Sequence, residues 1–314
     1  MSAANGASAA NRPASEAHPV NERGPRTSSI VVALFSLYII WGSTYLAIRI
    51  AVEGHFPPLY MAAARQMLAG AILYAVMRAR GAPAPTRANW RGGWIVGALL
   101  VTGGNGGISL GERSVSSSFA AIACASVPLW VALIGLGYGQ KPTRREVIGL
   151  VAGFSGVVVL DAGQPIAGDA VAFAAILASP VLWAWGSTLA PRVGLPRGGM
   201  ASALQMFCGG ILLAVLGAAF GEHFDGAPTA ESLAALTYLI VLGSLVGFSA
   251  YVFLLQTVRP AVATSYAYVN PIVAIALGAF SGEAITPRAL AAAALTLAGV
   301  AVIATAAKPK PKSA

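Results

Sequence analysis

The sequence contains two versions of one pattern, and most of that pattern consists of apolar segments long enough to cross a membrane. Trp41-Gly42-Ser43-Thr44 recurs 144 residues later as Trp185-Gly186-Ser187-Thr188, and the heptapeptide that begins at Met61 recurs at Met200. Further matches lie 143 residues apart and pair Val115, Pro128, Gly135, Gly139, Thr143 and Gly156 with Val258, Pro271, Gly278, Gly282, Thr286 and Gly299. Many transporter folds place two repeats around a site near the bilayer midplane. The duplication therefore favours a transporter.

The composition identifies the bilayer as the expected solvent of this chain. Charged residues make up 10% of it and apolar residues 57%, and the mean hydropathy is +0.72. A soluble domain carries about 25% charged residues. The net charge of +9 is spread over short loops and tails, which fits membrane orientation signals better than a nucleic-acid-binding face. Cys124 and Cys208 fall inside apolar segments, so we expect small core residues rather than a disulfide or a metal site.

Ten segments have the length and composition of membrane-spanning helices. A hydrocarbon core about 30 Å thick requires about 20 apolar residues per helix. The predicted spans are 30–52, 58–78, 92–111, 114–138, 145–161, 168–190, 199–220, 232–256, 260–281 and 287–307. They group into two five-helix repeats, 30–161 and 168–307. Residues 1–29 are predicted to be a disordered cytoplasmic tail, and residues 308–314 a basic cytoplasmic tail.

The distribution of Lys and Arg predicts how the helices are oriented. With the N-terminus in the cytoplasm, 16 of the 20 basic residues lie in the tails and the even-numbered connections. Only Arg49, Arg113 and Arg288 then lie at outer ends. Cytoplasmic loops are enriched in Lys and Arg, so both termini are expected in the cytoplasm. Because each repeat has an odd number of spans, the second repeat must enter from the opposite side, and the repeats are inverted.

Three motifs carry a resemblance to a known family. They are Tyr38-Ile39-Ile40-Trp41-Gly42-Ser43-Thr44-Tyr45, Pro57-Pro58-Leu59 and Thr264-Ser265-Tyr266-Ala267-Tyr268-Val269-Asn270-Pro271. The chain resembles the EamA branch of the drug/metabolite transporter superfamily over all ten predicted helices. The resemblance implies a 5+5 inverted repeat around a central cavity in the bacterial inner membrane. It also implies alternating-access export of small metabolites or drugs, without a cofactor.

The expected partners are the lipid bilayer and a small-molecule substrate, with amino acids, related compounds and hydrophobic drugs as candidate classes. A proton is one candidate coupling ion, and downhill transport is the alternative. The chain can be a monomer or a homodimer.

Aromatic and amide side chains inside the predicted helices are candidates for a substrate-binding cavity. Tyr38, Trp41 and Tyr45 share one face of the first helix, since they are three and four residues apart. We expect Trp41 and Trp185 in one cavity, with Asn105 and Asn270 nearby; anchoring at lipid headgroups is the alternative for the tryptophans. The remaining candidates are Ser43, Trp130, Trp183, Tyr251 and Tyr266.

Helix-breaking residues occur at matching places in the two repeats. Pro128 and Pro271 are expected either to mark kinks at which gates bend or to make fixed bends. The glycines of Gly103–Gly107 surround Asn105, and they allow either local unwinding toward the cavity or close helix packing. Packing is the favoured interpretation for the glycines, whereas Asn105 is expected to face the cavity.

Two charged residues deserve separate interpretations. Arg65 lies well inside a predicted span, where a charge is costly and usually paired. We expect it to bond helix-end carbonyls or a carboxylate, with a contact to a substrate carboxylate as the alternative. Its counterpart in the second repeat is Leu204. Glu112 ends the third span and is either a proton-coupling group or an exposed loop residue.

The sequence lacks the motifs of two rival classes. His18, His55 and His223 all lie outside the apolar segments, and no H-E-x-x-H motif occurs. An intramembrane enzyme is therefore not expected, and neither is a metal site. The phosphate-binding motif G-x4-G-K-[ST] is also absent, which argues against ATP-driven transport by this chain. A passive channel and a membrane scaffold are the alternatives to a carrier.

Overall fold

The computed structural model describes residues 27–113, 120, 123–161, 170–280 and 287–305, and these ranges are entirely helical apart from turns and short connections. The predicted tails therefore lie almost wholly outside the described residues. Helix α1 begins at Thr27, three residues earlier than the predicted start of the first span. The described parts of all ten predicted segments contain helix.

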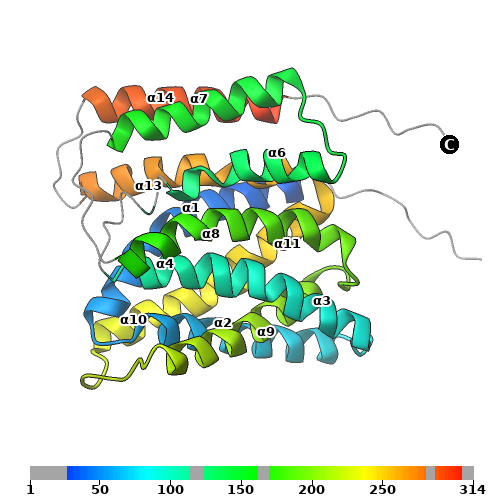
Figure 1. Ribbon diagram of the computed structural model, residues 1–314, viewed down its shortest axis with the longest axis vertical. Coiled ribbons are helices and arrows are strands. Elements are labelled where there is room, and N and C mark those ends of the chain that lie inside the picture. Colours follow the sequence, from blue (N-terminus) through cyan, green and yellow to red (C-terminus); the bar gives the residue numbers. More distant parts are fainter. Residues whose placement is uncertain (1–26, 114–119, 121–122, 162–169, 281–286, 306–314) are drawn as a thin grey trace, which may run out of the picture.

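The helices lie side by side in one bundle (Figure 1). The first half of the chain forms α1 (Thr27–Glu53), α2 (Pro58–Ala79), α3 (Arg87–Gly97), the π-helix η1 (Ala98–Asn105), α4 (Gly106–Gly111), α6 (Val127–Gly137) and α7 (Arg144–Asp161). The second half forms α8 (Ala170–Leu189), the 3-10 helix η2 (Ala190–Arg192), α9 (Gly199–Ala219), α10 (Ala230–Tyr238), the π-helix η3 (Leu239–Phe248), α11 (Ser249–Thr257), α12 (Pro260–Ala263), α13 (Tyr266–Phe280) and α14 (Pro287–Ala304).

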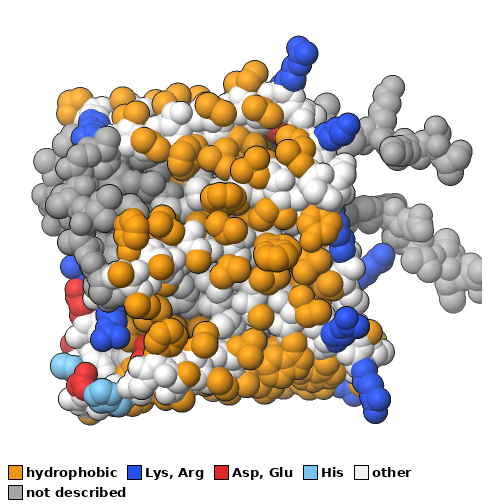
Figure 2. All heavy atoms as spheres, viewed as in Figure 1, with side chains coloured by type: hydrophobic (Ala, Val, Ile, Leu, Met, Phe, Trp, Pro, Cys, Tyr) orange, Lys and Arg blue, Asp and Glu red, His pale blue; other side chains and the backbone are white. Residues whose placement is uncertain are grey.

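Six helices of the described chain are long and apolar enough to cross a membrane. They span Thr27–Glu53, Pro58–Ala79, Arg87–Gly111, Ala170–Arg192, Gly199–Ala219 and Ala230–Thr257, and two shorter apolar helices span Ala123–Gly137 and Leu290–Ile303. Figure 2 shows hydrophobic side chains across the middle of the bundle, with most of the visible Lys and Arg at one edge and fewer, beside Asp, Glu and His, at the other. An all-helical membrane protein is thus confirmed. A full set of ten spans stays a prediction.

The two halves are held together by pairs of helices that contain the repeated motifs. The most extensive helix contacts are those of α2 with α9 and of α7 with α14. A Cβ on Gly70 would lie 2.6 Å from the backbone nitrogen of Phe207, and one on Gly210 would lie 2.8 Å from that of Met67. Close backbone approach of this kind requires small residues at the contact. The two helices that contain the duplicated heptapeptides therefore pack closely against each other.

The third helix of each half contains a π-helical stretch, η1 in one and η3 in the other. Unwinding of the glycine-rich segment, one of the two expectations for Gly103–Gly107, is thus wrong: the backbone stays helical and widens. The glycines serve close packing, as the favoured interpretation held. A Cβ on Gly104 would lie 2.4 Å from the ring of Trp183. π-Helical turns are frequent at functional sites.

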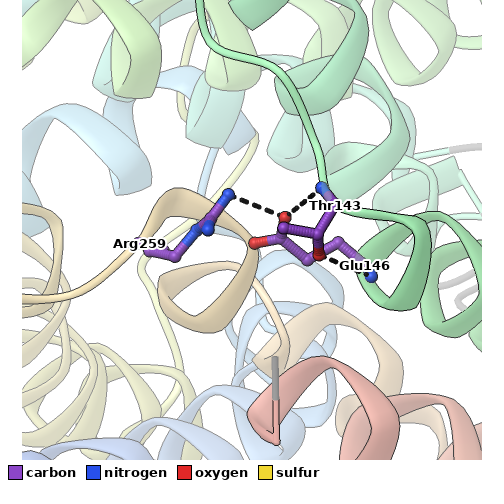
Figure 3. A network of polar contacts seen from close by, with 3 residues as sticks. All are labelled: Thr143, Glu146 and Arg259. Atoms are coloured by element: carbon purple, nitrogen blue, oxygen red, sulfur yellow. Dashed lines mark hydrogen bonds and ion pairs between the residues drawn. The ribbon is translucent and has the colours of Figure 1, made fainter. Parts of the chain in front are cut away.

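Two carboxylates that the sequence did not single out connect the halves. Glu146 accepts a hydrogen bond from the backbone of Thr143 at the start of α7, at 2.7 Å, and pairs with Arg259 at 2.7 Å (Figure 3). Glu222 accepts hydrogen bonds from the backbone nitrogens of Leu59 and Tyr60, each at 3.0 Å. A carboxylate at this place satisfies the free N–H groups at the start of α2.

Candidate functional site

A cavity lies between the two halves, with walls from both. Its volume is about 510 Å³, a figure that includes space open to solvent. The lining residues are Trp41, Thr44, Tyr45, Ile48, Arg65, Asn105, Ile108, Cys124, Val127, Ser179, Trp183, Tyr266 and Asn270.

One wall of the cavity is an aromatic cluster built from four helices. Trp41 of α1 contacts Trp183 of α8 and Tyr266 of α13 edge to face, with ring centroids 5.5 and 4.7 Å apart. Tyr251 of α11 packs against all three rings. Offset and edge-to-face contacts are the favoured geometries of aromatic pairs. The cluster lies at the part of the cavity nearer the start of α1, since Tyr45 and Ile48 lie further along α1.

The polar atoms of this cluster are satisfied within the protein. Trp41 Nε1 donates to the carbonyl of Gly243 at 3.0 Å, and Trp183 Nε1 donates to the hydroxyl of Tyr251 at 3.0 Å. The Tyr251 hydroxyl also shares a hydrogen bond with Ser187 at 2.6 Å. These bonds hold the rings of Trp41, Trp183 and Tyr251 in place.

The opposite part of the cavity carries amide and hydroxyl groups. Asn105 and Asn270 both line it, as predicted, and the Tyr45 hydroxyl lies beside Asn270 and Cys124. Asn270 is 2% exposed, and its Oδ1 has no hydrogen-bond partner among the described residues. Buried polar atoms are usually paired. An unpaired acceptor in a cavity wall is available to a ligand.

Arg65 also reaches the cavity, and its contacts differ from those expected. Its Nε donates to Ser244 Oγ in η3 at 2.8 Å, while no carbonyl or carboxylate of the described residues accepts a hydrogen bond from it. The expected carbonyl or carboxylate contact is therefore wrong. A serine of the other half takes its place, because the π-helical turn brings Ser244 next to Arg65. Glu112 lies within electrostatic range of this arginine.

Four predicted residues lie outside the cavity wall. Trp185 is 46% exposed and donates to the Tyr138 hydroxyl at 3.3 Å, so its expected place beside Trp41 is wrong. Trp183, two residues earlier, turns inward instead. Trp130 is exposed and bonds Ser126. Ser43 bonds Tyr238 at 2.5 Å, and Tyr251 lies behind the lining rings.

The two prolines of the repeated pattern occupy different places in their helices. Pro128 stands in the first turn of α6, after a break at Ser126, whereas Pro271 lies inside α13. Gating by either residue stays a prediction. The sequence interpretation missed Pro180 inside α8, next to Ser179, whose hydroxyl donates to the carbonyl of Gly104 at 2.7 Å. A proline within an apolar segment was the available signal.

Metal-ligating side chains do not gather in the described ranges: no group of three or more His, Cys, Asp or Glu could hold an ion there. Cys124 and Cys208 are free and buried. The site offers instead an aromatic wall, two amides, hydroxyls and one buried guanidinium.

The geometry defines a membrane protein with a cavity between two halves of similar sequence. Comparison with known families identifies the class. The profile of the EamA-like transporter family matches residues 28–160 and again residues 170–305. The chain belongs to this family and is a transporter of the EamA type.

Individual relatives agree with this assignment. The chain is 39% identical over 247 residues to "Uncharacterized inner membrane transporter YedA" of Escherichia coli, covering 78% of this chain and 80% of that protein. It is 26% identical over 287 residues, 88% of this chain and 94% of the relative, to "Probable terminal-alkyne amino-acid exporter" of Streptantibioticus cattleyicolor. A solved crystal structure that is 21% identical superposes with a TM-score of 0.72 over 89% of this chain and 98% of that chain, which shows a shared fold.

Proposed function

We propose that this protein is a secondary active transporter that exports small organic metabolites across the bacterial inner membrane by alternating access. Amino acids and related compounds are the first substrate class to test, because one relative is named as an amino-acid exporter. Hydrophobic drugs are the second class. The proposal includes ten spans in a 5+5 inverted repeat with both termini in the cytoplasm.

The observation that carries the proposal is the position of the cavity. It is walled by both repeats, and its wall combines aromatic rings with buried polar groups. Transporters with inverted repeats bind substrate at the repeat interface, and one repeat rocks against the other. A cavity of this kind can be exposed to either side in turn.

Contacts on one side of the cavity support a closed cytoplasmic gate in this state. Beyond the aromatic cluster, the Tyr38 hydroxyl shares a hydrogen bond with Ser265 at 2.9 Å. Glu146 and Arg259 pair at the same end of the bundle, where the basic residues gather (Figures 2 and 3). Each contact joins the first half to the second. Opening this side requires their separation, and that is the motion that alternating access needs.

Counterflow in proteoliposomes tests the proposal. We expect saturable uptake of radiolabelled L-leucine, accelerated by unlabelled L-leucine inside the vesicles, because a carrier returns faster when loaded. Vesicles that contain no protein are the control. Flux that is neither saturable nor accelerated indicates a channel. Absence of protein-dependent flux for amino acids and for a hydrophobic cation such as ethidium would contradict transport by this chain.

A further inference from the structure

A second hollow lies where α2, α3 and α9 come together at one edge of the bundle (Figure 1). We call it the α2–α9 groove. It shares no lining residue with the central cavity. Its volume is about 480 Å³, a figure that includes space open to the surroundings. The lining residues are Ala71 and Tyr74 of α2, Trp90 of α3, and Ala203, Leu204 and Phe207 of α9.

The groove is apolar and has a buried floor and an open rim. Ala203 and Leu204 are fully buried, whereas Ala71 is exposed and Trp90 is half-buried. None of the six lining residues is charged. Since Ala71 lies in a helix long and apolar enough to cross a membrane, its exposed side faces lipid. The groove therefore suits an acyl chain from the bilayer rather than a polar solute.

The aromatic residues of the rim mark its depth in the membrane. The rings of Tyr74 and Trp90 contact each other, with their centroids 6.2 Å apart. Tyr and Trp are enriched at the boundary between the acyl chains and the headgroups. The end of α2 and the start of α3 lie one turn beyond these rings, so this end of the groove reaches the headgroup level.

Two arginines stand at that level. Arg78 follows Tyr74 by four residues and Arg87 precedes Trp90 by three, so each lies on the same helix face as its ring and about 5.4 Å further along the helix. Both are exposed, and neither forms an ion pair with the residues that the structure describes. Moreover, the sequence has no Asp or Glu between residues 54 and 111. The positive charge at this place is thus not neutralised locally.

We propose that the α2–α9 groove binds one anionic phospholipid, with an acyl chain in the groove and the phosphate against Arg78 and Arg87. A guanidinium pairs with phosphate through two parallel hydrogen bonds. Basic pockets between helices on the cytoplasmic side of a membrane bind anionic headgroups, and the proposed topology places this connection in the cytoplasm. The inference goes beyond the proposed transport function and does not depend on it.

The selectivity of this site comes from the headgroup. Phosphatidylcholine offers the same acyl chains, but it has no net charge and presents an ammonium group as well as a phosphate. The bound lipid contacts both halves at the extensive contact of α2 with α9. A ligand that binds only the folded state stabilises it. Anionic lipid is therefore expected to raise the thermal stability of the protein.

Quenching of tryptophan fluorescence by brominated acyl chains tests the site, because Trp90 lines it. The purified full-length protein is reconstituted in phosphatidylcholine, and dibrominated phosphatidylglycerol or dibrominated phosphatidylcholine is added at the same mole fraction. We expect phosphatidylglycerol to quench more, and Trp90→Phe to remove most of this excess. Trp94→Phe is the matched control, since Trp94 is 38% exposed on the same helix but does not line the groove. Equal quenching by the two lipids, or an excess that Trp90→Phe leaves intact, would overturn the inference.

Charge variants assign the headgroup. Arg78→Gln and Arg87→Gln should each lower the affinity for phosphatidylglycerol relative to phosphatidylcholine about fivefold. Arg145→Gln is the matched control, because it removes one exposed arginine from the start of α7, across the bundle from α3 (Figure 1). An equal loss in Arg145→Gln would show a general attraction of anionic lipid to a basic surface and would refute the site.

A variant that fills the groove keeps all charges. Ala71→Phe should abolish the excess quenching, whereas Ala75→Phe, at an exposed position one turn along α2, should not. This pair decides the matter if an arginine variant does not fold. A parent protein with counterflow but equal quenching by both lipids refutes the inference and leaves transport intact. A selective lipid site in a protein without counterflow of any solute supports the inference and contradicts the proposed function.

Discussion

At the scale of single residues, Trp41 of the first half and Trp183 of the second half form one wall of the cavity, with ring centroids 5.5 Å apart. Trp41, Asn105 and Asn270 line the cavity as expected. The repeated tetrapeptide pairs Trp41 with Trp185, but the structure places Trp183 at the cavity. Trp183 and Trp185 lie on different faces of α8, and only the packing of α8 against its neighbours decides which face is buried. A Cβ on Gly247 would lie 2.4 Å from Trp41 and one on Gly104 the same distance from Trp183, so each ring fills a glycine gap of the other half.

The pair Trp183 and Trp185 gives a prediction at this scale. Trp183→Ala removes a ring that contacts Trp41 and Tyr251. We expect it to lower the free energy of unfolding by up to about 5 kcal/mol. We also expect it to lower the rate of counterflow at least tenfold. Trp185→Ala is the matched control, since its exposed ring bonds only Tyr138 among the described residues. Thermal unfolding of the detergent-solubilised proteins and counterflow measure both. A larger effect of Trp185→Ala would contradict the placement.

At the scale of helices, hydropathy predicted where the apolar segments lie. It predicted neither the π-helical stretches within them nor the ion pair that joins the two halves. The predicted 145–161 segment is α7, Arg144–Asp161. The π-helices η1 and η3 have the composition of ordinary apolar helix, so nothing in the periodicity distinguished them. The ion pair between Glu146 and Arg259 joins residues 113 apart in the chain, a distance over which local pattern carries no information.

This ion pair provides the prediction for helix–helix coupling. Glu146→Gln can still accept the hydrogen bond from Thr143, because Gln also serves in a capping box, but it loses the charge that pairs with Arg259. Breaking a fully buried ion pair lowers the free energy of unfolding by about 3–5 kcal/mol. We expect a smaller loss here, because the Arg259 side chain is 20% exposed. In the double variant with Arg259→Gln, the losses should not add. Glu53→Gln, in the exposed pair with Arg49, should have no measurable effect.

Additive losses in thermal unfolding of the double variant would show that the two side chains act independently. If the losses do not add, and if the variants are also labelled faster by a thiol reagent from the cytoplasmic side, the ion pair between Glu146 and Arg259 is part of the proposed gate. Inside-out vesicles give access to that side for a membrane-impermeant thiol reagent.

At the scale of the whole molecule, the charge pattern predicts the topology. With 16 basic residues in tails and even-numbered connections against three at outer ends, both termini should face the cytoplasm. Alkaline phosphatase fused after residue 314 should be inactive, whereas fluorescent protein fused there should fluoresce. A phosphatase fusion in the 221–229 connection between α9 and α10 should be active. An active fusion after residue 314 would overturn the orientation.

The shared cavity leads to a prediction about access. In a background in which Cys124 and Cys208 are replaced by alanine, Asn105→Cys and Asn270→Cys should react with an impermeant thiol reagent added from the outer side. The reason is that the aromatic cluster and the contact of Tyr38 with Ser265 join the two halves near the start of α1, the side that the proposed topology places in the cytoplasm. A transported solute should slow the labelling at both positions, since both side chains line one cavity.

The control for access is Leu37→Cys, a fully buried position one turn closer to the start of α1 than Trp41. It should stay unreactive from the outer side whether or not solute is present. If Asn105→Cys and Asn270→Cys label only from the cytoplasmic side, the resting state is open inward and the proposed gate is at the wrong end. Labelling from the outer side with solute protection at both positions would place them in one substrate pathway between the two repeats.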